Sequence, residues 1–333
     1  MIATEHIHAL RALSARAETQ GQLTPEQLAV VYDHGWFKAF VPRSYGGLEL
    51  TFPAGVRLEE ELAWIDGSLG WTITLCAGAN LFVGYLDPSV AQVLFSNRTV
   101  CLGGSGQASG RAVREKGGYR ISGKWRYATG APHLTHFTAN CLIDDTSVVK
   151  SFFFAKGDVH VEEDWPAFGL KATASHSFSV SDHWVSKSHA FDISPEYATL
   201  PQLIYRYPFL QFAEATLAAN TLGMARHFIL CAAEFVKTDS AGKLAKAQQL
   251  LADVRASFYA AVDASWGELT LRGDLSLATS QAVSNQSRAL VRLCREQVIA
   301  LYPHVGLVAA NPTTEINRIW RDLFTASQHS LLR

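Results

Sequence analysis

The order of the hydrophobic periodicities along the chain is the feature that most limits its fold. Apolar residues recur at helical spacing up to about residue 97, give way to short runs separated by glycine turns, and return to helical spacing beyond Tyr205. Helices and strands segregated in this way argue against the strict alternation of a doubly wound nucleotide-binding fold. We therefore predict a mainly α protein with a central antiparallel β-sheet or barrel, divided into a helical domain (1–98), a β domain (99–190) and a helical bundle (191–333).

Local signals predict where several elements begin. Thr24 is placed to cap a helix, because a proline and a glutamate occupy the first turn after it. Asn311 and Pro312 are predicted to begin the last helix for a similar reason, and Gly117 with Gly118 is the clearest hairpin turn. Three long segments of helical period would build the bundle: 208–236, 243–271 and 277–301.

The composition excludes several classes of protein. With 18% charged residues and a formal net charge of -1, the chain lacks the basic surface that phosphate binding requires, so we expect no nucleic-acid partner. Its five cysteines are widely spaced and include no Cys-x-x-Cys pair, which predicts neither a disulfide framework nor a zinc site. The most apolar run, 72–86, is shorter than a membrane helix, and charged residues interrupt the start of the chain, where a secretory signal would be apolar. We expect a cytoplasmic protein without a membrane partner.

Three segments carry polar residues suited to binding a cofactor. Segment 103–110 is rich in glycine and serine, but strands rather than a helix follow it, so taken alone it indicates a flexible connection and not a phosphate loop. In segment 122–130 an aromatic strand ends in Thr129 and Gly130. That end either lays Thr129 against a flat heteroaromatic ring or simply finishes a core strand in a turn. The third segment, 165–177, is irregular, apolar and rich in hydroxyl groups.

Four short patterns occur in an order that points to one known family. They are Pro42-x-x-Tyr45-Gly46-Gly47, the stretch 67–71 (Gly-Ser-Leu-Gly-Trp), the strand end 123–130 and the stretch 169–175 (Gly-Leu-Lys-Ala-Thr-Ala-Ser). On a helical, β, helical background this order resembles the acyl-CoA dehydrogenase superfamily over nearly the whole chain. The closest likeness is to its flavin-dependent monooxygenase branch, the oxygenase components of two-component aromatic hydroxylases.

The resemblance implies a flavin, FAD or alternatively FMN, enclosed between the β domain and the last helical domain. The protein would place hydrogen-bonding groups around a ring that does the electron chemistry itself. The resemblance further implies a small aromatic substrate, a separate flavin reductase and a homo-oligomer, either a dimer or a tetramer, in which a neighbouring subunit completes the cofactor site. The cofactor-binding residues that it implies are Gly104, Ser105, Tyr127, Ala128, Thr129, Thr173, Ser175, Arg318 and Arg321.

The end of the chain carries the most discriminating residues. Arg318-x-x-Arg321-Asp322 resembles the segment before the family's active-site loop, and dehydrogenases place a catalytic glutamate shortly after it. This chain has no glutamate after Glu315, and His329 stands close to that place instead, as in the monooxygenase branch. Its three-to-four spacing from the arginines predicts that His329 shares their helix face. Because histidine titrates near neutrality, the resemblance implies His329 as a catalytic residue.

Further histidines and glutamates complete the set of candidates. His133 matches a histidine after the strand end in the monooxygenase branch, and we predict it as a second catalytic residue. Paired with His136 it makes a poor metal site, because no Cys, Asp or Glu lies near it in the sequence, so we predict no bound metal. Glu214 and Glu234 stay as weaker alternatives for a catalytic base, because some family members take it from an earlier helix of the bundle.

Three functions remain open at this point. The first is a flavin-dependent monooxygenase, which the missing terminal glutamate favours. The second is an acyl-CoA dehydrogenase, which needs a catalytic carboxylate that the sequence does not place. The third is a non-catalytic member that keeps the fold to bind a ligand or partner, because the glycine-rich segment lacks the acidic residues typical of dehydrogenases.

Overall fold

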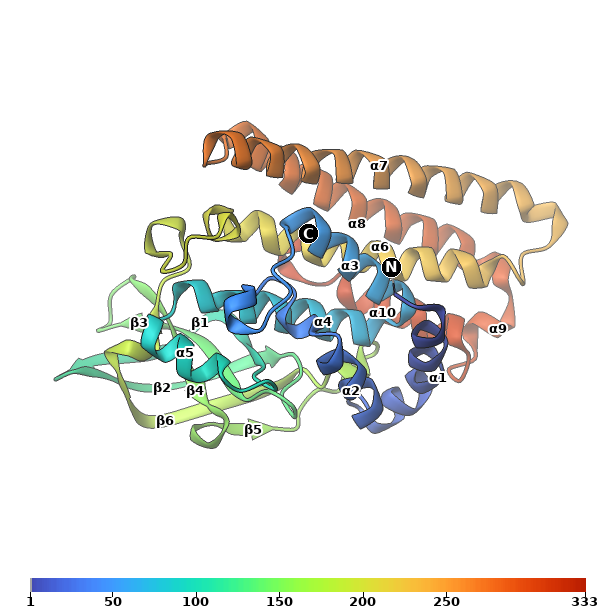
Figure 1. Ribbon diagram of the computed structural model, residues 1–333. Helices are drawn as coiled ribbons and strands as arrows, with labels where there is room; N and C mark the ends of the chain where they lie inside the picture. The colour runs from blue at the N-terminus through green and yellow to red at the C-terminus, as the bar shows by residue number, and fades with distance from the viewer. Residues whose placement is uncertain (1) are drawn as a thin grey trace.

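A computed structural model describes residues 2–333 (Figure 1). The first part of the chain is helical, with α1 (Thr4–Gln20), α2 (Pro25–Asp33), α3 (Phe52–Ile65), α4 (Gly67–Asn80) and α5 (Pro88–Phe95). Strands follow, namely β1 (Leu102–Glu115), β2 (Gly118–Ala128), β3 (His136–Ile143), β4 (Val149–Ala155), β5 (His160–Glu162), β6 (His176–Ser186) and β7 (Ala190–Phe191). The last part holds α6 (Phe209–Ala232), α7 (Ala241–Arg272), α8 (Leu277–Val305), α9 (Leu307–Ala310) and α10 (Glu315–Ala326). The prediction of a mainly α protein with a central sheet is confirmed.

Within residues 2–333 the strands form one mixed, open sheet in the order β5-β6-β2-β1-β3-β4-β7. β1 and β2 form an antiparallel hairpin, but the chain then crosses β1, so that β3 pairs with β1 in parallel, with Leu102 opposite His136. The place beside β2 that a simple meander would give to β3 is taken by β6. In this described part of the chain no pairing joins the edge strands β5 and β7. The predicted antiparallel barrel is therefore wrong, because local turn signals do not reveal this crossover.

Segment 103–110 is part of β1 rather than a flexible connection, which corrects the interpretation made from the sequence. Gly104 pairs with Thr138 of β3, and a Cβ atom at this glycine would overlap the carbonyl oxygen of Thr138. The register shifts between Ser105 and Gly110, where the strand surface is exposed. The small residues therefore allow a close approach of two strands and an irregular ladder.

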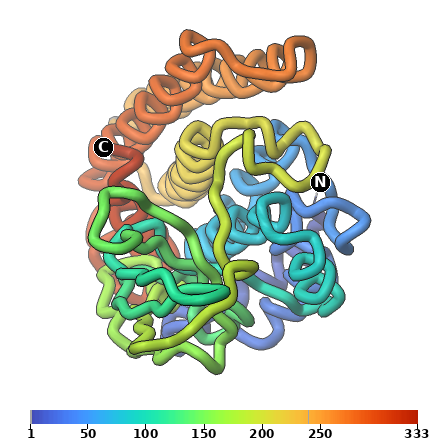
Figure 2. Tube along the Cα trace, turned by 90° about the vertical axis from the view of Figure 1, so that its left-hand side faces the viewer, coloured from blue at the N-terminus to red at the C-terminus, as the bar shows by residue number. Residues whose placement is uncertain are grey.

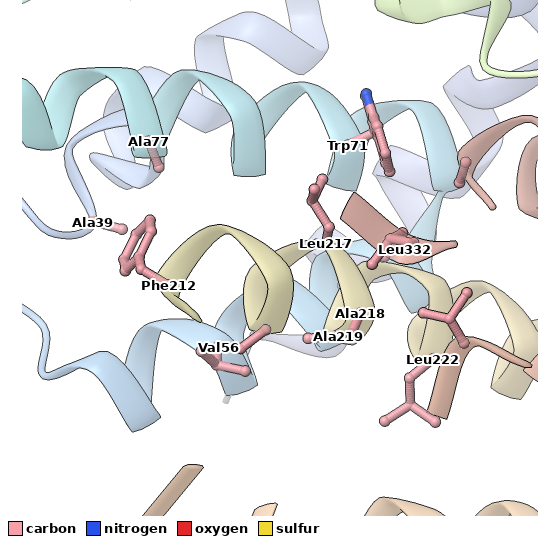
Figure 3. Packing of buried hydrophobic residues seen from close by; sticks show 14 of the residues in the cluster. Ala39, Val56, Trp71, Ala77, Phe212, Leu217, Ala218, Ala219, Leu222 and Leu332 are labelled. Carbon is pink, nitrogen blue, oxygen red and sulfur yellow. The ribbon is translucent and has the colours of Figure 1, made fainter. Parts of the chain in front are cut away.

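α6 forms the centre of the helical part. Figure 3 shows Leu217 of α6 beside Trp71 of α4, with Val56 of α3 on the opposite side of α6. The long helices α7 and α8 lie on the side of α6 that faces away from the sheet, as both Figure 1 and Figure 2 show. None of the helices within residues 2–333 combines the length and the apolar character needed to span a bilayer.

The ends of two helices test the capping predictions. Thr24 caps α2 as predicted, with both halves of a capping box present. α10 instead begins later than predicted, because its N-cap is Thr314, whose hydroxyl accepts a hydrogen bond from the amide of Asn317. Asn311 stabilises a preceding turn by accepting from the amide two residues further on, at 3.0 Å. The helix ends at Ala326, so the terminal histidine lies beyond it and not on its face as predicted.

Candidate active site at the strand ends

The end of β2 and the start of β6 meet close to the start of β1, and buried hydroxyl groups are joined there. The Oγ1 atom of Thr129 lies 2.9 Å from the Oγ atom of Ser175, which lies 2.7 Å from the Oγ1 atom of Thr173. All three side chains are buried. The amide of Gly130 donates to the carbonyl oxygen of Thr173 at 2.8 Å, which fastens the loop before β6 to the strand end. We call Thr129, Ser175 and Thr173 the hydroxyl chain.

Its hydrogen bonds can run in only one direction. The hydroxyl of Thr173 donates to the carbonyl oxygen of Leu170 at 2.8 Å, and a hydroxyl has a single proton to give. Ser175 must therefore donate to Thr173, and Thr129 must donate to Ser175. The hydroxyl chain thus leaves the lone pairs of the Thr129 oxygen unused, so its free end is an acceptor.

The backbone beside the hydroxyl chain is strained. Tyr127, Leu170 and Ala174 have φ angles of 68°, 53° and 44°, in the left-handed region that side chains disfavour. They are three of the seven non-glycine residues with positive φ within residues 2–333. Each costs on the order of 1 kcal/mol or more, and such residues cluster at functional sites, where the surrounding structure holds them. The strained backbone therefore marks this part of the sheet as a candidate functional site.

The other residues predicted to contact a cofactor lie next to the hydroxyl chain. The side chain of Tyr127 is exposed, and its ring meets the ring of Trp165 edge-on at 5.9 Å between centroids. Ala128 is buried at the last position of β2. Gly104 and Ser105, near the start of β1, are both partly exposed. The residues at the strand ends that were predicted to contact a cofactor thus lie in one region of the structure.

A cleft of about 790 Å³ opens beside this region. Its lining includes Trp165 together with Lys171 and His176, which flank Thr173 and Ser175 in the sequence. Clefts of this size hold cofactors and small substrates. The segments that carry Thr173 and Ser175 therefore border this cleft, although none of the three residues of the hydroxyl chain lines it.

α10 holds the loop that carries Thr173 and Ser175. The amide of Gly169 donates to the hydroxyl of Thr325 at 2.9 Å, and the amide of Leu170 donates to the Oδ1 atom of Asp322 at 2.6 Å. A Cβ atom at Gly169 would overlap the backbone of α10. Asp322, from the Arg-Asp segment identified in the sequence, thus helps to hold the loop that carries Thr173 and Ser175.

The two arginines predicted to bind the cofactor are both buried. Arg321 pairs with Glu18 of α1, and it also donates to the carbonyl oxygen of Phe168 at 3.0 Å and to Asn317 at 2.8 Å. These bonds use its Nε and Nη1 atoms, and its Nη2 atom makes no hydrogen bond with residues 2–333. The side chain of Arg318 also makes none with these residues, so both arginines stay predicted cofactor ligands.

Burial, together with the nearby carboxylate of Asp66, raises the pKa of Asp322 from its ordinary value of 3.8 to about 8. The folded protein therefore holds a proton on Asp322 that the unfolded chain releases between these two pH values. Because the folded state binds the extra proton, the free energy of unfolding falls as the pH rises through this window.

We expect Asp322→Asn to remove that pH dependence, because asparagine keeps an oxygen to accept from Leu170 but does not ionise. Urea unfolding of both proteins from about pH 5 to about pH 8 measures the effect, with a steeper fall for the natural protein. Parallel curves for the two proteins would contradict this account of Asp322.

His329 lies beyond α10, at the N-cap of the short helix η10 (Ser330–Leu332). Its ring lies 6.0 Å from the ring of Trp71 of α4, and the buried side chain of Leu332 anchors the segment. Burial lowers the pKa of His329, with Arg333 adding to the effect. The imidazole is therefore uncharged near neutral pH and able to accept a proton.

His133 has other neighbours than His329. Its ring stacks on Phe37 at 5.4 Å between centroids, and one of its ring nitrogens lies within 4.8 Å of the sulfur atoms of Cys76 and Cys101. Its role as a second catalytic residue stays a prediction.

The two alternative glutamates are not placed as catalytic bases. Glu214 is buried, but its carboxylate pairs with Arg288 and accepts a hydrogen bond from Ser284. Glu234 is exposed just beyond the end of α6. A carboxylate held in an ion pair and one in solvent are both poorly suited to removing a substrate proton.

Comparison with known proteins identifies the fold. Residues 215–333 match the family model described as the C-terminal domain of acyl-CoA dehydrogenase. The chain is 25% identical to the oxygenase subunit HsaA of a flavin-dependent monooxygenase from Mycobacterium tuberculosis, over 96% of this chain and 88% of that relative. The resemblance to the acyl-CoA dehydrogenase superfamily is confirmed. Its relative is a member of the monooxygenase branch, as the sequence patterns predicted.

Solved structures agree with this assignment of the fold. The HsaA monooxygenase from Mycobacterium tuberculosis matches with a TM-score of 0.93 at 18% identity, covering 98% of this chain and 91% of that chain. XiaF from Streptomyces sp., in complex with FADH2 and glycerol, matches with a TM-score of 0.90 at 21% identity, covering 99% of this chain and 91% of that chain. At these identities the likeness shows that the chain shares the fold of these proteins.

Sequence reasoning missed the residues that organise the site. Thr325 fastens the loop to α10, and nothing in its sequence context reveals a partner more than 150 residues away. Cys76 and Cys101 were dismissed because they are distant in sequence, although the fold brings their sulfurs together. The sequence does offer one signal, the hydroxyl-rich segment before β6, but it does not reveal that this segment is hydrogen-bonded to Thr129.

Proposed function

We propose that this protein is the oxygenase component of a flavin-dependent monooxygenase, which takes up reduced FAD and hydroxylates a small aromatic substrate with molecular oxygen. The observation that carries the proposal is the hydroxyl chain, whose free end at Thr129 is an acceptor. Support also comes from the relatives, since one is named an oxygenase subunit and another is bound to FADH2.

An acceptor at Thr129 suits reduced flavin better than oxidised flavin. The reduced isoalloxazine ring carries a hydrogen on its N5 atom, whereas the oxidised ring has a lone pair there. With N5 held against the Thr129 oxygen, the reduced ring would donate a hydrogen bond to it, whereas the oxidised ring would leave two acceptors facing each other. Leaving a buried polar group unpaired costs about 1–3 kcal/mol, which corresponds to about 5- to 150-fold in affinity.

The residues around the strand end fit a flat ring. Tyr127 presents an exposed aromatic side chain at a fixed backbone angle, and Gly104 with Ser105 offers partly exposed backbone on the neighbouring strand. When bound, the reduced flavin supplies the electrons that activate molecular oxygen. The protein's own part is to orient the ring, and α10 contributes by holding the loop at Gly169.

His329 is the residue that we propose accepts the substrate proton. Burial keeps its imidazole uncharged near neutral pH, because burial lowers its pKa, and Trp71 provides an adjacent aromatic surface. Removing the proton from a phenolic hydroxyl makes the substrate ring richer in electrons and so more open to oxygen insertion. We do not assign this step to His133, because one of its ring nitrogens lies within 4.8 Å of two cysteine sulfur atoms.

The function is tested by supplying the protein with reduced FAD in the absence of oxygen, then adding isotopically labelled oxygen and a set of small phenols and indoles. A product that contains one labelled oxygen atom supports the proposal. Bleaching of bound oxidised FAD by an acyl-CoA thioester would contradict it and establish a dehydrogenase. Failure to bind either form of FAD or FMN would also contradict it and favour a non-catalytic member of the fold.

We expect Thr173→Val to reduce the preference for reduced FAD over oxidised FAD by about tenfold, since Ser175 is then free to donate to Thr129 and Thr129 to donate outward. The amide of residue 173 still donates to Leu170 at 3.1 Å, so the loop keeps its shape. Anaerobic titration with both forms of FAD measures the ratio. Thr221→Val, at a buried threonine of α6, is the matched control and is expected to leave the ratio unchanged.

We further propose a separate flavin reductase as the source of reduced FAD, and assembly of the chain into a homo-oligomer. Two leucines at the α7–α8 turn, Leu271 and Leu277, are 88% and 74% exposed, and Leu307 beside α8 is 89% exposed. Leu271 and Leu277 expose apolar surface at this end of the bundle, and Leu307 does so at the opposite end of α8. Exposed apolar side chains that gather at one place, like the pair at the turn, can mark a contact between subunits. Native mass spectrometry that detects only a monomer at micromolar concentration would contradict the assembly.

A further inference from the structure

Cys76, Cys101 and His133 come from three separate segments that the fold joins into one cluster. Their two sulfur atoms and one imidazole nitrogen all lie within 4.8 Å of one another. Both cysteines are fully buried, and the Nε2 atom of His133 is buried without a hydrogen-bond partner among residues 2–333. We propose that this cluster binds a thiophilic divalent metal ion, with Zn²⁺ as the ion that suits the donors best.

The donor set is that of zinc sites. Thiolate sulfur binds Zn²⁺ at about 2.3 Å and imidazole nitrogen at about 2.0 Å, so donors around a tetrahedral ion stand about 3.4 to 3.8 Å apart. Donor atoms already within 4.8 Å of one another reach this spacing through side-chain shifts of about an ångström. The three residues leave a fourth position for water or for the carbonyl oxygen of Thr129, which lies 3.9 Å from the Cys76 sulfur.

The backbone around the cluster is tied together on two sides. Asn80 donates to the carbonyl oxygen of Cys76 at 3.0 Å and accepts from the amide of Leu102 at 3.3 Å, which joins α4 to the start of β1. The hydroxyl of Thr135 accepts from the amide of Cys101 at 3.0 Å, and the backbone amide of Thr135 donates to the carbonyl oxygen of Cys101 at 2.9 Å. These bonds join β1 to the turn that carries the histidine. Supports of this kind fix the positions of metal ligands.

The unpartnered nitrogen of His133 needs an explanation of its own. A buried polar atom without a partner costs about 1–3 kcal/mol, and native structures contain few of them. The neighbouring thiols are weak donors and do not fully relieve this cost. Stacking on Phe37 holds the imidazole in place, so the nitrogen cannot simply turn outward. A metal ion satisfies the nitrogen and both sulfur atoms at once.

A second group of potential ligands does not carry the same proposal. In the group of His227, Cys231 and Glu315, the Nε2 atom of His227 is already paired with the Glu315 carboxylate at 3.3 Å. The positively charged guanidinium groups of Arg11 and Arg318 lie close enough to this group to shift the pKa values of its members. Two nearby cations oppose the binding of a third. The cluster at Cys76 is therefore the stronger site.

The site is tested on the full chain without flavin, so that its outcome is separate from that of the proposed function. The metal content of the purified protein is measured, the metal is removed with a chelator, and Co²⁺ is added under reducing conditions. We expect one equivalent of metal and the intense absorption of thiolate bound to tetrahedral cobalt. A protein that contains no stoichiometric metal and gives no thiolate–cobalt absorption would overturn the proposal. So would a disulfide between Cys76 and Cys101.

Variants decide whether the cluster is the site. Cys76→Ser and His133→Gln are each expected to weaken cobalt binding by about 100-fold or more, since even the loss of a residue that only supports a ligand costs about 10–100-fold. Cys294→Ser removes a buried cysteine of α8 and is expected to bind cobalt like the natural protein. Circular dichroism checks that each variant is folded. Thiolate–cobalt absorption that persists in a folded Cys76→Ser variant would contradict the assignment.

Discussion

Replacing His329 by alanine is expected to slow substrate hydroxylation by about 10²–10⁴-fold while the affinity for reduced FAD stays the same. The imidazole lies beside Trp71 at the end of the chain, and burial lowers its pKa, so it is ready to accept a proton. It makes a single weak hydrogen bond of its own, from the amide of Leu331 at 3.4 Å, and its removal leaves the fold intact. Single-turnover product formation and anaerobic FAD titration measure the two quantities separately.

Two further variants sharpen this experiment. His329→Gln keeps a polar side chain but cannot take up a proton near neutral pH, so it is expected to be as slow as the alanine variant. His160→Ala removes an exposed histidine of β5 and is expected to have no effect. If His329→Gln hydroxylates the substrate at the natural rate, His329 does not act as a base.

Gly169→Ala is expected to lower the free energy of unfolding by about 1–3 kcal/mol and to abolish the preference for reduced FAD. Its new Cβ atom would overlap the backbone oxygen of Arg321, which the rigid turn of α10 cannot move aside. The loop must then shift, and its bonds to Thr325 and Asp322 are lost. Because that loop carries Thr173 and Ser175, the hydroxyl chain loses its alignment. Urea unfolding and FAD titration measure the two effects.

The matched control is Gly157→Ala, at an exposed glycine between β4 and β5 where a Cβ atom meets nothing within 4 Å. We expect its stability and its FAD preference to equal those of the natural protein. A Gly169→Ala variant that behaves like this control would show that α10 does not position the loop.

Much of the fold follows from local patterns, which the chain displays clearly. The capping box at Thr24 depends on residues within one turn, and the sequence reveals it. The parallel pairing of Leu102 with His136 depends on a crossover that no local signal specifies, so the sheet was predicted as antiparallel. The late start of α10 has a similar cause, since Asn311 and Thr314 are both good caps and packing chooses between them.

The candidate site was predictable in its residue types but not in their connections. The strand end at Thr129 and the hydroxyl-rich segment were both found, yet their junction through Ser175 requires the β2–β6 pairing. Arg321 also has a partner that the sequence does not reveal. It is predicted to contact the cofactor, and the fold in addition pairs it with Glu18, on a helix at the other end of the chain.

The most direct test of the account is the affinity of the natural protein for reduced and oxidised FAD, both measured by anaerobic titration. With Thr129 fixed as an acceptor, reduced FAD is expected to bind at least about fivefold more tightly than oxidised FAD. Equal affinities, or tighter binding of oxidised FAD, would contradict the central claim that the hydroxyl chain selects the reduced cofactor for use with oxygen.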